Sequence, residues 1–403
     1  MLNRREFLAR AAVAVAAPSL AAATRAPTAT QSPSESFDPW LEIDRGALAS
    51  NARAVATLAG GRPIIAVVKN NAYGTGLETA GPILDALAEV RMLAVVRPEE
   101  ALTLRRAGVK KPLLLMGPAS EAEVTELLLK DVVQSLATEE ALVVYSRVSR
   151  RLSRPIPVHL YVDTGMHRMG MPVDRALAVI DDLLHGAGPP LRIEGAFTEL
   201  TEDADFDRVQ AQGLRELHAK ARAHGSDFLQ LHAASSDAIQ HGTTEALLDA
   251  VRPGLALYGG YVSDRARARA DLRPAYSLKA RVIRVDRLEA GDGVSYHRRW
   301  KADKPTWTAT LAVGHVDGYP SGAVKGCEVL VRDRLFPVIG NVSASHTILD
   351  LGDTQAVQVG DVATLVGPQN PALHPNEVAK RAGYSEYDMF MHLSPKLRRQ
   401  VVG

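Results

Sequence analysis

The sequence of 403 residues lacks several features that would define other classes of protein. Its single cysteine, Cys327, excludes an internal disulfide and a metal site built from several thiolates. The formal net charge is only +1, so the charge balance does not indicate nucleic acid or an acidic membrane as a partner. No run is long and apolar enough to indicate a clear membrane span. These absences and the length are those of a globular protein with two domains, or with one barrel and an addition.

Several short motifs of catalysis and binding are also missing. Gly74 and Gly76 follow an apolar run, but they do not complete the Gly-x-Gly-x-x-Gly spacing of a dinucleotide site. Neither a P-loop nor a Gly-x-Ser-x-Gly motif occurs. The twelve histidines form no His-x-x-x-His pair with a carboxylate, and examples such as His232 and His315 are scattered. We therefore expect no metal site.

Residues 1–23 have the composition of an export signal. Arg4 and Arg5 precede Phe7, Leu8 and a weakly apolar stretch that ends in small residues suited to cleavage. The pattern resembles a twin-arginine signal, which predicts a periplasmic protein. An ordinary secretory signal or an uncleaved anchor is the alternative. Residues 24–39, rich in Ser, Thr and Pro, are expected to be a flexible leader.

From residue 40 to residue 270 the chain has the pattern of an α/β barrel. Helix-like segments such as Pro98–Ala107 and Val173–Leu184 alternate with short apolar runs. Eight such repeats predict a parallel (β/α)₈ barrel of the TIM type, with a doubly wound sheet as the alternative. The predicted strands are Pro63–Lys69, Arg91–Val96, Pro112–Gly117, Val132–Ala137, Pro157–Thr164, Arg192–Leu200, Phe228–Ser236 and Ala250–Gly259.

The pattern changes at about residue 271. Little helix is predicted between the strand-like segments that follow, and Gly291-Asp292-Gly293 is a turn signal. Residues 271–403 are therefore predicted to form a second, mostly β domain. Its expected strands include Tyr276–Arg287, Thr308–Val313, Glu328–Arg332 and Phe336–Val342.

Lys69 ends the first predicted strand of the barrel. A lysine in that position can lie partly desolvated, which disfavours the ammonium and leaves an amine able to form a Schiff base or act as a base. Gly74 and Gly76 let the backbone turn close to a ligand, and Tyr73 supplies a phenol. The alternative is a solvated lysine at the end of a strand.

Other reactive residues fall near the ends of later predicted strands. Arg168 follows the fifth strand, Ser236 ends the seventh, and Arg252 lies in the eighth. Active sites of such barrels lie at the carboxyl ends of the strands, so these side chains are expected on one face. Ser236 with Gly254 and Leu255 fits a phosphate site, which barrels place after strands seven and eight. The alternative is that the serine pair at 235–236 caps a helix.

Three separated motifs carry a resemblance to a known family. The segment Ile64–Gly76, which contains Val-Val-Lys-Asn-Asn-Ala-Tyr-Gly-Thr-Gly, resembles the pyridoxal-phosphate lysine segment of alanine racemases. Asp163-Thr164-Gly165-Met166-His167-Arg168 resembles their D-T-G-M-x-R, and Val294-Ser295-Tyr296 their tyrosine segment. A barrel followed by a β domain is also the layout of these enzymes, so the resemblance covers nearly all of the chain after the signal. It implies pyridoxal 5'-phosphate as cofactor and an amino acid as the small-molecule substrate.

The resemblance assigns two catalytic bases. Lys69 matches the lysine that binds the cofactor covalently and serves as one base, and Tyr296 matches the opposite base. Racemisation removes a proton from one face of the α-carbon and delivers one to the other, so two bases on opposite sides are the natural arrangement. In these enzymes the tyrosine comes from the partner subunit, which implies a homodimer with composite sites. Without the family, Tyr296 would be interpreted as a half-buried strand tyrosine.

The resemblance also assigns residues to the cofactor. Arg252 matches the arginine that faces the pyridine nitrogen; it can only donate, which weakens the cofactor as an electron sink and disfavours transamination. The alternative for Arg252 is a salt bridge at the rim. Arg168 matches the arginine that holds the cofactor phenolate or the substrate carboxylate. Tyr73 and Tyr387 match phosphate-contacting tyrosines, the latter on Ser385-Glu386-Tyr387 alone.

Three positions near the cofactor depart from the family's pattern. The lysine that usually supports the D-T-G-M-x-R arginine is Tyr161, so Arg168 must be held differently. The usual T-H pair reads Thr198-Glu199, whose carboxylate could pair with Arg252. The asparagine before the phosphate serine is Ser235.

Two further departures concern the substrate. The entrance motif G-Y-A-D-G reads Gly314-His315-Val316-Asp317-Gly318, and the M-D pair that helps receive the substrate carboxylate reads Ala344-Ser345. Ala344 is thus the expected substrate-binding residue of this pair. Loss of the methionine and the entrance tyrosine should widen or repolarise the pocket, so we expect a substrate other than alanine, or a broader set.

The leading hypothesis is a periplasmic, pyridoxal-phosphate-dependent amino-acid racemase, an isomerase. One alternative keeps the cofactor with another outcome, such as decarboxylation, aldol cleavage or transamination; Glu199 and Ala344 leave room for it, and Arg252 argues against it. A second alternative is a non-catalytic binding homologue, against which the joint presence of Lys69, Tyr296 and Arg252 speaks.

Overall fold

The apolar runs of the first half form parallel strands because both faces of their sheet are covered. Every residue of β2, β4 and β5 is buried. The strand order is β2-β3-β4-β5-β6-β8-β9, with β7 beside β6. The strands are β2 (Ile64–Val67), β3 (Val90–Val95), β4 (Leu113–Leu115), β5 (Val132–Leu136), β6 (Ile156–Asp163), β7 (Met171–Pro172), β8 (Leu191–Phe197) and β9 (Gln230–His232).

The computed structural model describes residues 36–186, 190–226 and 230–403. The export signal expected at 1–23 and most of the leader expected at 24–39 lie outside these residues. No helix of the described ranges combines the length and the apolar character needed to cross a membrane.

The ring of strands closes between β9 and β2. Ala250 bridges to His232 and Val251 bridges to Ile64, both in parallel. The rest of the eighth strand expected at 250–259 is not extended, because the 3₁₀ helix η3 (Leu255–Tyr258) replaces it. The predicted barrel architecture is confirmed, with an eighth strand far shorter than predicted.

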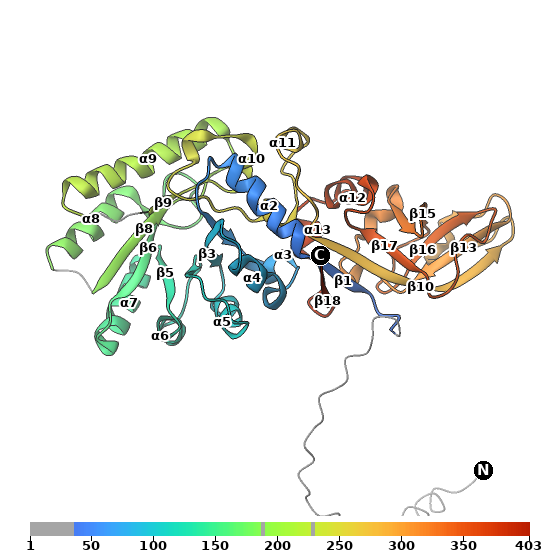
Figure 1. Ribbon diagram of the computed structural model, residues 1–403, viewed down its shortest axis with the longest axis horizontal. Helices are drawn as coiled ribbons and strands as arrows, with labels where there is room; N and C mark the ends of the chain where they lie inside the picture. The colour runs from blue at the N-terminus through green and yellow to red at the C-terminus, as the bar shows by residue number, and fades with distance from the viewer. Residues whose placement is uncertain (1–35, 187–189, 227–229) are drawn as a thin grey trace, which may run out of the picture. The chain divides into compact units, whose positions relative to one another are not determined.

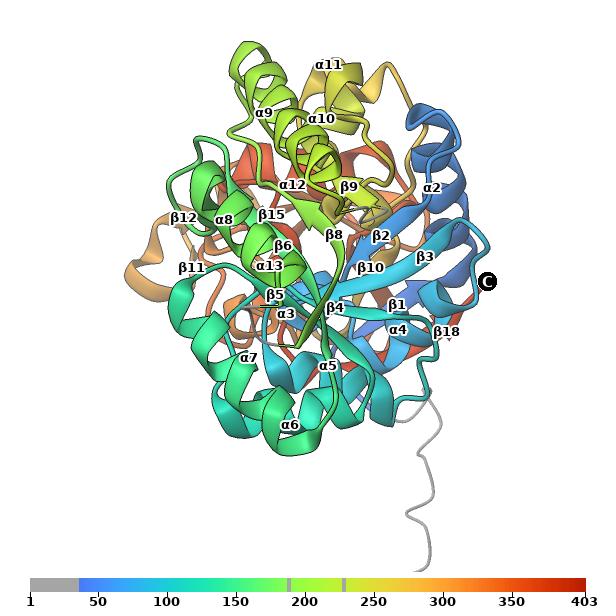
Figure 2. The same ribbon diagram turned by 90° about the vertical axis from the view of Figure 1, so that its left-hand side faces the viewer.

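The helices of the first half lie around the outside of these strands, as Figure 2 shows for α5, α6, α7 and α8. Local sequence explains their ends: Ser120 caps α6 by accepting from the Glu123 backbone, and Glu123 accepts in return from the Ser120 backbone. α8 begins and ends where predicted, and α5 ends one residue earlier than predicted. The helices are α2 (Arg45–Leu58), α4 (Leu77–Asp85), α5 (Pro98–Arg106), α6 (Glu121–Leu129), α7 (Glu139–Leu152), α8 (Val173–Leu184), α9 (Ala204–Ala223), α10 (Ser236–His241), η2 (Thr244–Ala246) and α11 (Asp264–Arg267).

The second half forms a mostly antiparallel sheet in the order β13-β16-β15-β14-β17-β10-β1-β18, with β13 also paired to β10 (Figure 1). The prediction of a mostly β second half is confirmed. The strands are β1 (Trp40–Asp44), β10 (Tyr276–Leu288), β13 (Thr306–Leu311), β14 (Glu328–Val331), β15 (Arg334–Ile339), β16 (Thr347–Gly352), β17 (Val362–Val366) and β18 (Arg398–Val402). Between them lie the hairpin β11 (Gly293–Val294) and β12 (Trp300–Lys301), and η4 (Tyr296–Arg298), η5 (His315–Asp317), η6 (Ser321–Lys325), η7 (Pro371–Leu373), α12 (Pro375–Ala382) and α13 (Asp388–Met391).

β1 belongs to this second sheet, although its residues fall in the range expected for the barrel. It runs antiparallel to β10, with Trp40 opposite Lys279, and parallel to β18, with Trp40 opposite Arg398. The chain therefore starts in the sheet of the second half and enters the barrel through α2, which Asp44 caps by accepting from Ala47 at 2.9 Å.

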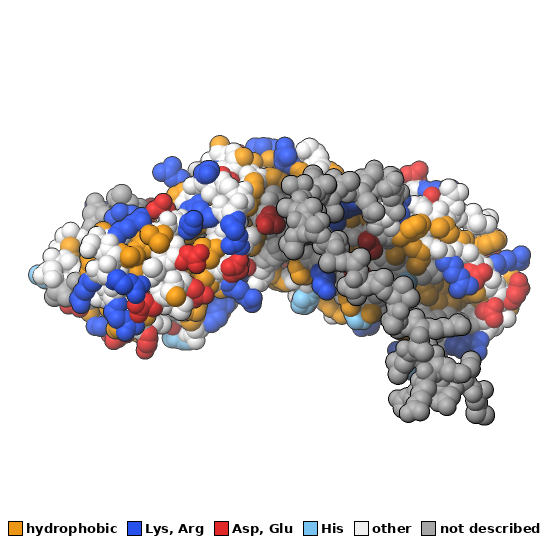
Figure 3. Space-filling model, turned by 90° about the horizontal axis from the view of Figure 1, so that it is seen from below, with side chains coloured by type: hydrophobic (Ala, Val, Ile, Leu, Met, Phe, Trp, Pro, Cys, Tyr) orange, Lys and Arg blue, Asp and Glu red, His pale blue; other side chains and the backbone are white. Residues whose placement is uncertain are grey.

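Charged side chains of both signs are interspersed on the face of the molecule seen in Figure 3. This distribution agrees with a formal net charge of +1. The described residues on this face show no broad field of one sign.

Candidate active site

The side chains predicted at the ends of the barrel strands converge on one cavity of about 390 Å³. Lys69 follows β2, Arg168 follows β6, and Ser236 follows β9. A cavity of this size suits a small-molecule ligand. The predicted residues that line it are Lys69, Tyr73, Arg168, Ser236, Arg252, Gly254 and Tyr387.

Lys69 is followed by one turn of left-handed helix. Asn70, Asn71, Ala72 and Tyr73 have φ angles of 53°, 57°, 52° and 52°. This conformation costs an L-residue roughly 1–2 kcal/mol, although asparagine tolerates it better than most. Such strain persists only where surrounding contacts impose it, and it is typical of functional sites.

Glu100 of α5 supplies those contacts. Its Oε1 accepts from the Asn70 backbone at 2.6 Å, and its Oε2 accepts from the backbones of Val96 and Arg97 at 3.1 Å each. The next turn is closed by Gly74, at φ 76°, where a Cβ would lie 2.2 Å from the Phe390 carbonyl oxygen. Sequence reasoning missed Glu100; an acidic residue in the first turn of a helix just after a barrel strand is the signal that could have found it.

One end of the cavity is rich in hydroxyl groups. The Ser236 hydroxyl accepts from the backbones of Gly254 and Ala256 at 3.0 and 3.1 Å, which leaves its hydrogen free to donate. Burial raises the pKa of Tyr73 and of Tyr387, so both phenols remain protonated donors. Three hydroxyl donors at one end of the cavity fit a phosphate group.

Gly254 is required for this arrangement. A Cβ built there would lie 2.0 Å from the Tyr73 hydroxyl. The helix-cap alternative for the serine pair holds for Ser235, which accepts from Asp237 at 3.2 Å and begins α10, while Ser236 turns to Gly254. Leu255, the other predicted cofactor residue, is fully buried at the start of η3, and its role stays a prediction.

The carboxylate of Glu202 would repel a phosphate group at the hydroxyl-rich end of the cavity. Sequence reasoning missed this residue. It lines the cavity with a strained φ of 65°. Burial, and then the carboxylates of Asp237, Asp207 and Glu386, raise the pKa of Glu202, which lessens its repulsion of a phosphate.

Arg252 is deeply buried in the floor of the cavity. Its Nη2 donates to the Thr198 carbonyl at 2.8 Å and to Glu199 Oε1 at 2.9 Å, and its Nη1 donates to the carbonyl and Nδ1 of His232 at 2.9 Å. The guanidinium also lies 5.0 Å from the centre of the Phe197 ring. The pairing with Glu199 suggested by the sequence is confirmed, and the rim salt bridge is wrong because Arg252 is only 3% exposed.

The contact with Arg252 fixes the proton positions on two buried histidines. Because arginine can only donate, His232 Nδ1 accepts, and its Nε2 must carry the hydrogen that bonds His159 Nδ1 at 2.7 Å. Burial, and then Arg252, lower the pKa of His232 and lower that of His159 to about 4. Both imidazoles are therefore neutral at pH 7. Sequence reasoning missed this pair because the two residues are 73 positions apart.

We expect the stability of the protein to depend on His159 below neutral pH. Its pKa is lower in the folded than in the unfolded state, so its contribution is present above pH 6.5 and is lost as pH falls towards 4. The loss is about 3 kcal/mol by pH 4.

In His159→Asn the amide oxygen still accepts from His232 but does not titrate. Urea unfolding should show the free-energy gap between wild type and variant shift by about 3 kcal/mol in favour of the variant from pH 7 to pH 4. A gap that stays constant between pH 7 and pH 4 would contradict this assignment.

Tyr296 does not line the cavity of Lys69. It begins η4 after the β11 strand and is 70% exposed, so the half-buried strand interpretation is wrong. Asn341 Nδ2 donates to its carbonyl at 2.8 Å, and both residues line a separate cavity of about 460 Å³ with Ser343 and His346. The φ values of 62° at Ser295 and 61° at His297 show a strained loop that presents the phenol.

Two segments that depart from the family's substrate-binding motifs, 314–318 and 344–345, are joined by backbone hydrogen bonds. His315 donates from its backbone to the Ser343 carbonyl at 3.0 Å, and Val316 donates to the Ala344 carbonyl at 3.2 Å. Ala344 is exposed and borders the segment that lines the Tyr296 cavity. Its role in substrate binding stays a prediction.

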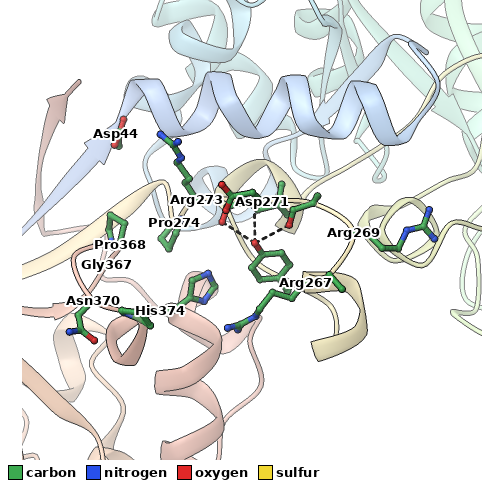
Figure 4. A pocket seen from close by; sticks show the side chains of 15 residues that line it. Asp44, Arg267, Arg269, Asp271, Arg273, Pro274, Gly367, Pro368, Asn370 and His374 are labelled. Carbon is green, nitrogen blue, oxygen red and sulfur yellow. Dashed lines mark hydrogen bonds between the residues drawn. The ribbon is translucent and has the colours of Figure 1, made fainter.

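A larger cavity of about 810 Å³ lies around Tyr261 and holds none of the predicted residues (Figure 4). The Tyr261 hydroxyl is satisfied by the Leu272 backbone N–H at 2.8 Å and the Ala270 carbonyl at 3.1 Å. Arg267 pairs with Glu377 at 3.2 Å. Within the described part of the chain, no three His, Cys, Asp or Glu side chains are grouped so that they could hold a metal ion.

The cavity combines three features: a lysine after the first barrel strand, a buried arginine, and a hydroxyl-rich end that fits a phosphate group. Together with the parallel barrel, these features define a class of cofactor-dependent barrel enzyme. Two family models, the alanine racemase N-terminal and C-terminal domains, match residues 43–262 and 275–401. The chain belongs to the alanine racemase family.

Similar proteins extend along nearly the whole chain. An alanine racemase of Clostridium tetani is 30% identical over 90% of this chain and 95% of its own length. An alanine racemase of Shewanella loihica is 34% identical over 89% of this chain and 98% of its own length. The structure of alanine racemase from D-cycloserine-producing Streptomyces lavendulae has a TM-score of 0.82 at 28% identity and covers 91% of this chain and 98% of its own. The structure of alanine racemase from Bacillus anthracis, with bound L-Ala-P, has a TM-score of 0.80 at 30% identity. It covers 91% of this chain and 96% of its own.

Enzymes of this family depend on pyridoxal phosphate. The residues of this chain fit that group. Lys69 would attach it covalently, Arg252 would face its ring nitrogen, and its phosphate would be held by Ser236, Tyr73 and Tyr387. The space that Gly254 leaves for the Tyr73 phenol is the observation that carries the fit.

Gly254→Ala is expected to weaken cofactor binding at least about tenfold, because the new methyl group displaces the Tyr73 phenol and narrows the phosphate end. The measurement is an absorbance titration of the apoenzyme with pyridoxal phosphate. Gly213→Ala is the control, since its Cβ would make only ordinary contact with Thr164 at 3.6 Å. Equal affinities of the two variants would contradict the assignment of the phosphate end.

Proposed function

We propose that the protein is an amino-acid racemase that interconverts L- and D-enantiomers with pyridoxal phosphate. The observation that carries the proposal is the joint lining of one cavity by Lys69, Arg252 and the hydroxyl-rich end around Ser236. Membership of the alanine racemase family supports it.

Each residue has a distinct task in this proposal. When bound, pyridoxal phosphate withdraws electrons from the substrate's α-carbon and so makes its proton acidic. The Lys69 amine takes or returns the proton on one face, and the Tyr296 phenol serves the other face. Arg252, held as a permanent donor, keeps a proton off the cofactor's ring nitrogen, which favours proton exchange over transamination.

We propose a homodimer in which Tyr296 enters the site of the other subunit. Two observations support this. Tyr296 is 70% exposed, and it lines a cavity different from that of Lys69. A symmetric dimer would form two composite sites through one self-complementary interface.

We propose that the substrate set is broader than alanine. The support is chemical: His315 and Ala344 stand where the family pattern has the entrance tyrosine and the methionine. Their two segments are joined by the backbone hydrogen bonds from His315 to Ser343 and from Val316 to Ala344. A panel of L-amino acids incubated with the enzyme in D₂O should give deuterium at the α-carbon and both enantiomers for alanine and for larger amino acids. Turnover of alanine alone would defeat the broader set, and retained configuration or lost carbon dioxide would defeat racemisation.

We also propose that the protein is exported to the periplasm, because Arg4 and Arg5 lie in a segment that resembles a twin-arginine signal. Cell fractionation should recover the protein in the periplasm, and Arg4→Lys with Arg5→Lys should retain it in the cytoplasm. Unchanged export of the double variant would indicate an ordinary secretory route.

A further inference from the structure

We infer that Glu199 is a positioning residue that orients Arg168 towards the carboxylate of the substrate. The inference rests on the proposed function, and it concerns a residue that stands where the family pattern has a histidine. Tyr161 stands where the pattern has the lysine that supports this arginine, so Arg168 needs another support.

The Glu199 carboxylate bridges the two arginines of the cavity. Its Oε1 lies 2.9 Å from Arg252 Nη2 and its Oε2 lies 3.4 Å from Arg168 Nη2. The backbone of Glu199 is itself held, because buried Gln210 donates to its carbonyl at 3.0 Å. One fixed carboxylate therefore connects the arginine assigned to the cofactor ring with the arginine assigned to the substrate.

The two arginines depend on Glu199 to different degrees. The side chain of Arg252 is 2% exposed, and it keeps three other acceptors: two carbonyls and His232 Nδ1. The side chain of Arg168 is 59% exposed, and Glu199 is the one carboxylate paired with it among the described residues. Loss of the Glu199 charge should therefore release Arg168 and leave Arg252 in place.

Tyr161 is a second neighbour of Arg168. Burial and then Glu199 raise the pKa of Tyr161, while the nearby Arg168 lowers it. The phenol thus stays neutral, and its ring stacks on Phe197 with centroids 4.4 Å apart. Tyr161 supplies a contact but no charge, so the negative charge that holds Arg168 comes from Glu199.

The test compares Glu199→Gln with wild type in the holoenzyme. We expect the KM for a turned-over amino acid to rise at least about tenfold while kcat changes less than about threefold, because the lost contact orients the substrate. Acetate, a carboxylate that needs no turnover, is the second probe, and its affinity measured by calorimetry should fall about tenfold. The affinity of the apoenzyme for pyridoxal phosphate should stay within about twofold.

The sign of the acetate effect separates positioning from neutralisation. If Glu199 only neutralised Arg168, its removal would free the guanidinium and acetate would bind more tightly, which would overturn the inference. Glu202→Gln is the matched control: it removes a carboxylate from the same cavity without contacting either arginine, so acetate binding should hold or strengthen.

A double variant completes the test. In the background of Arg168→Ala, Glu199→Gln should change acetate affinity less than about twofold, since the two residues act together. A full tenfold loss in that background, or a matching loss of cofactor affinity, would overturn the inference. Acetate results as expected in an enzyme that racemises nothing would sustain the role of Glu199 and defeat the proposed function.

Discussion

Lys69→Ala should abolish racemisation, with kcat lowered by a factor on the order of 10⁴ or more. The variant loses both the amine that attaches the cofactor and the base for one face of the α-carbon. Ser236, Tyr73 and Tyr387 remain, so pyridoxal phosphate should still bind without covalent attachment. The measurements are chiral analysis of the amino acid and the cofactor absorption spectrum.

The control for this variant is Lys220→Ala, an exposed lysine of α9, which should behave as wild type. An added small primary amine should restore part of the α-proton exchange in Lys69→Ala, because it can enter the vacated space. Undiminished racemisation in Lys69→Ala would remove Lys69 from the mechanism altogether.

Tyr296→Phe should lower racemisation by a factor on the order of 10²–10⁴ and leave half of the chemistry intact. The phenol is the proposed base for the face opposite to Lys69, and phenylalanine fills the same space without a proton to exchange. In D₂O, the enantiomer whose proton faces Lys69 should therefore exchange without inversion. The other enantiomer should neither exchange nor invert.

Tyr384→Phe is the matched control, since that tyrosine bonds Ser321 at 3.0 Å and lines neither of the two cavities assigned to the reaction. It should retain wild-type rates. Equal loss of exchange from both enantiomers in Tyr296→Phe would mean that the phenol supports the site as a whole and does not serve one face.

The architecture could be predicted from the sequence because buried parallel strands appear as short apolar runs, and helices such as α6 carry their own caps. The eighth strand was over-extended in prediction. Its apolar residues Leu255–Tyr258 are buried like those of a strand, but Gly254 turns the chain and a 3₁₀ helix follows. Burial alone does not distinguish the two conformations.

The grouping of seven predicted residues around one cavity could be predicted because barrels gather chemistry at strand ends and because the family motifs stand at those ends. Their supports could not. The left-handed turn after Lys69 reverses the sign of φ, which hydrophobic periodicity does not record. Glu100 reaches Asn70 across 30 positions, and the contact between His159 and His232 spans 73, so only the folded chain brings these groups together.

We propose that Lys69 of one subunit and Tyr296 of its partner form one site, and a heterodimer can test this arrangement. Lys69→Ala and Tyr296→Phe chains would be co-expressed with different affinity tags, and the species carrying both tags would be isolated. One of its two sites then has both bases and the other has neither, so about half of the wild-type kcat per dimer is expected although each parent is nearly inactive. A heterodimer as inactive as its parents would mean that both residues of a site come from the same chain, and the composite site would be wrong.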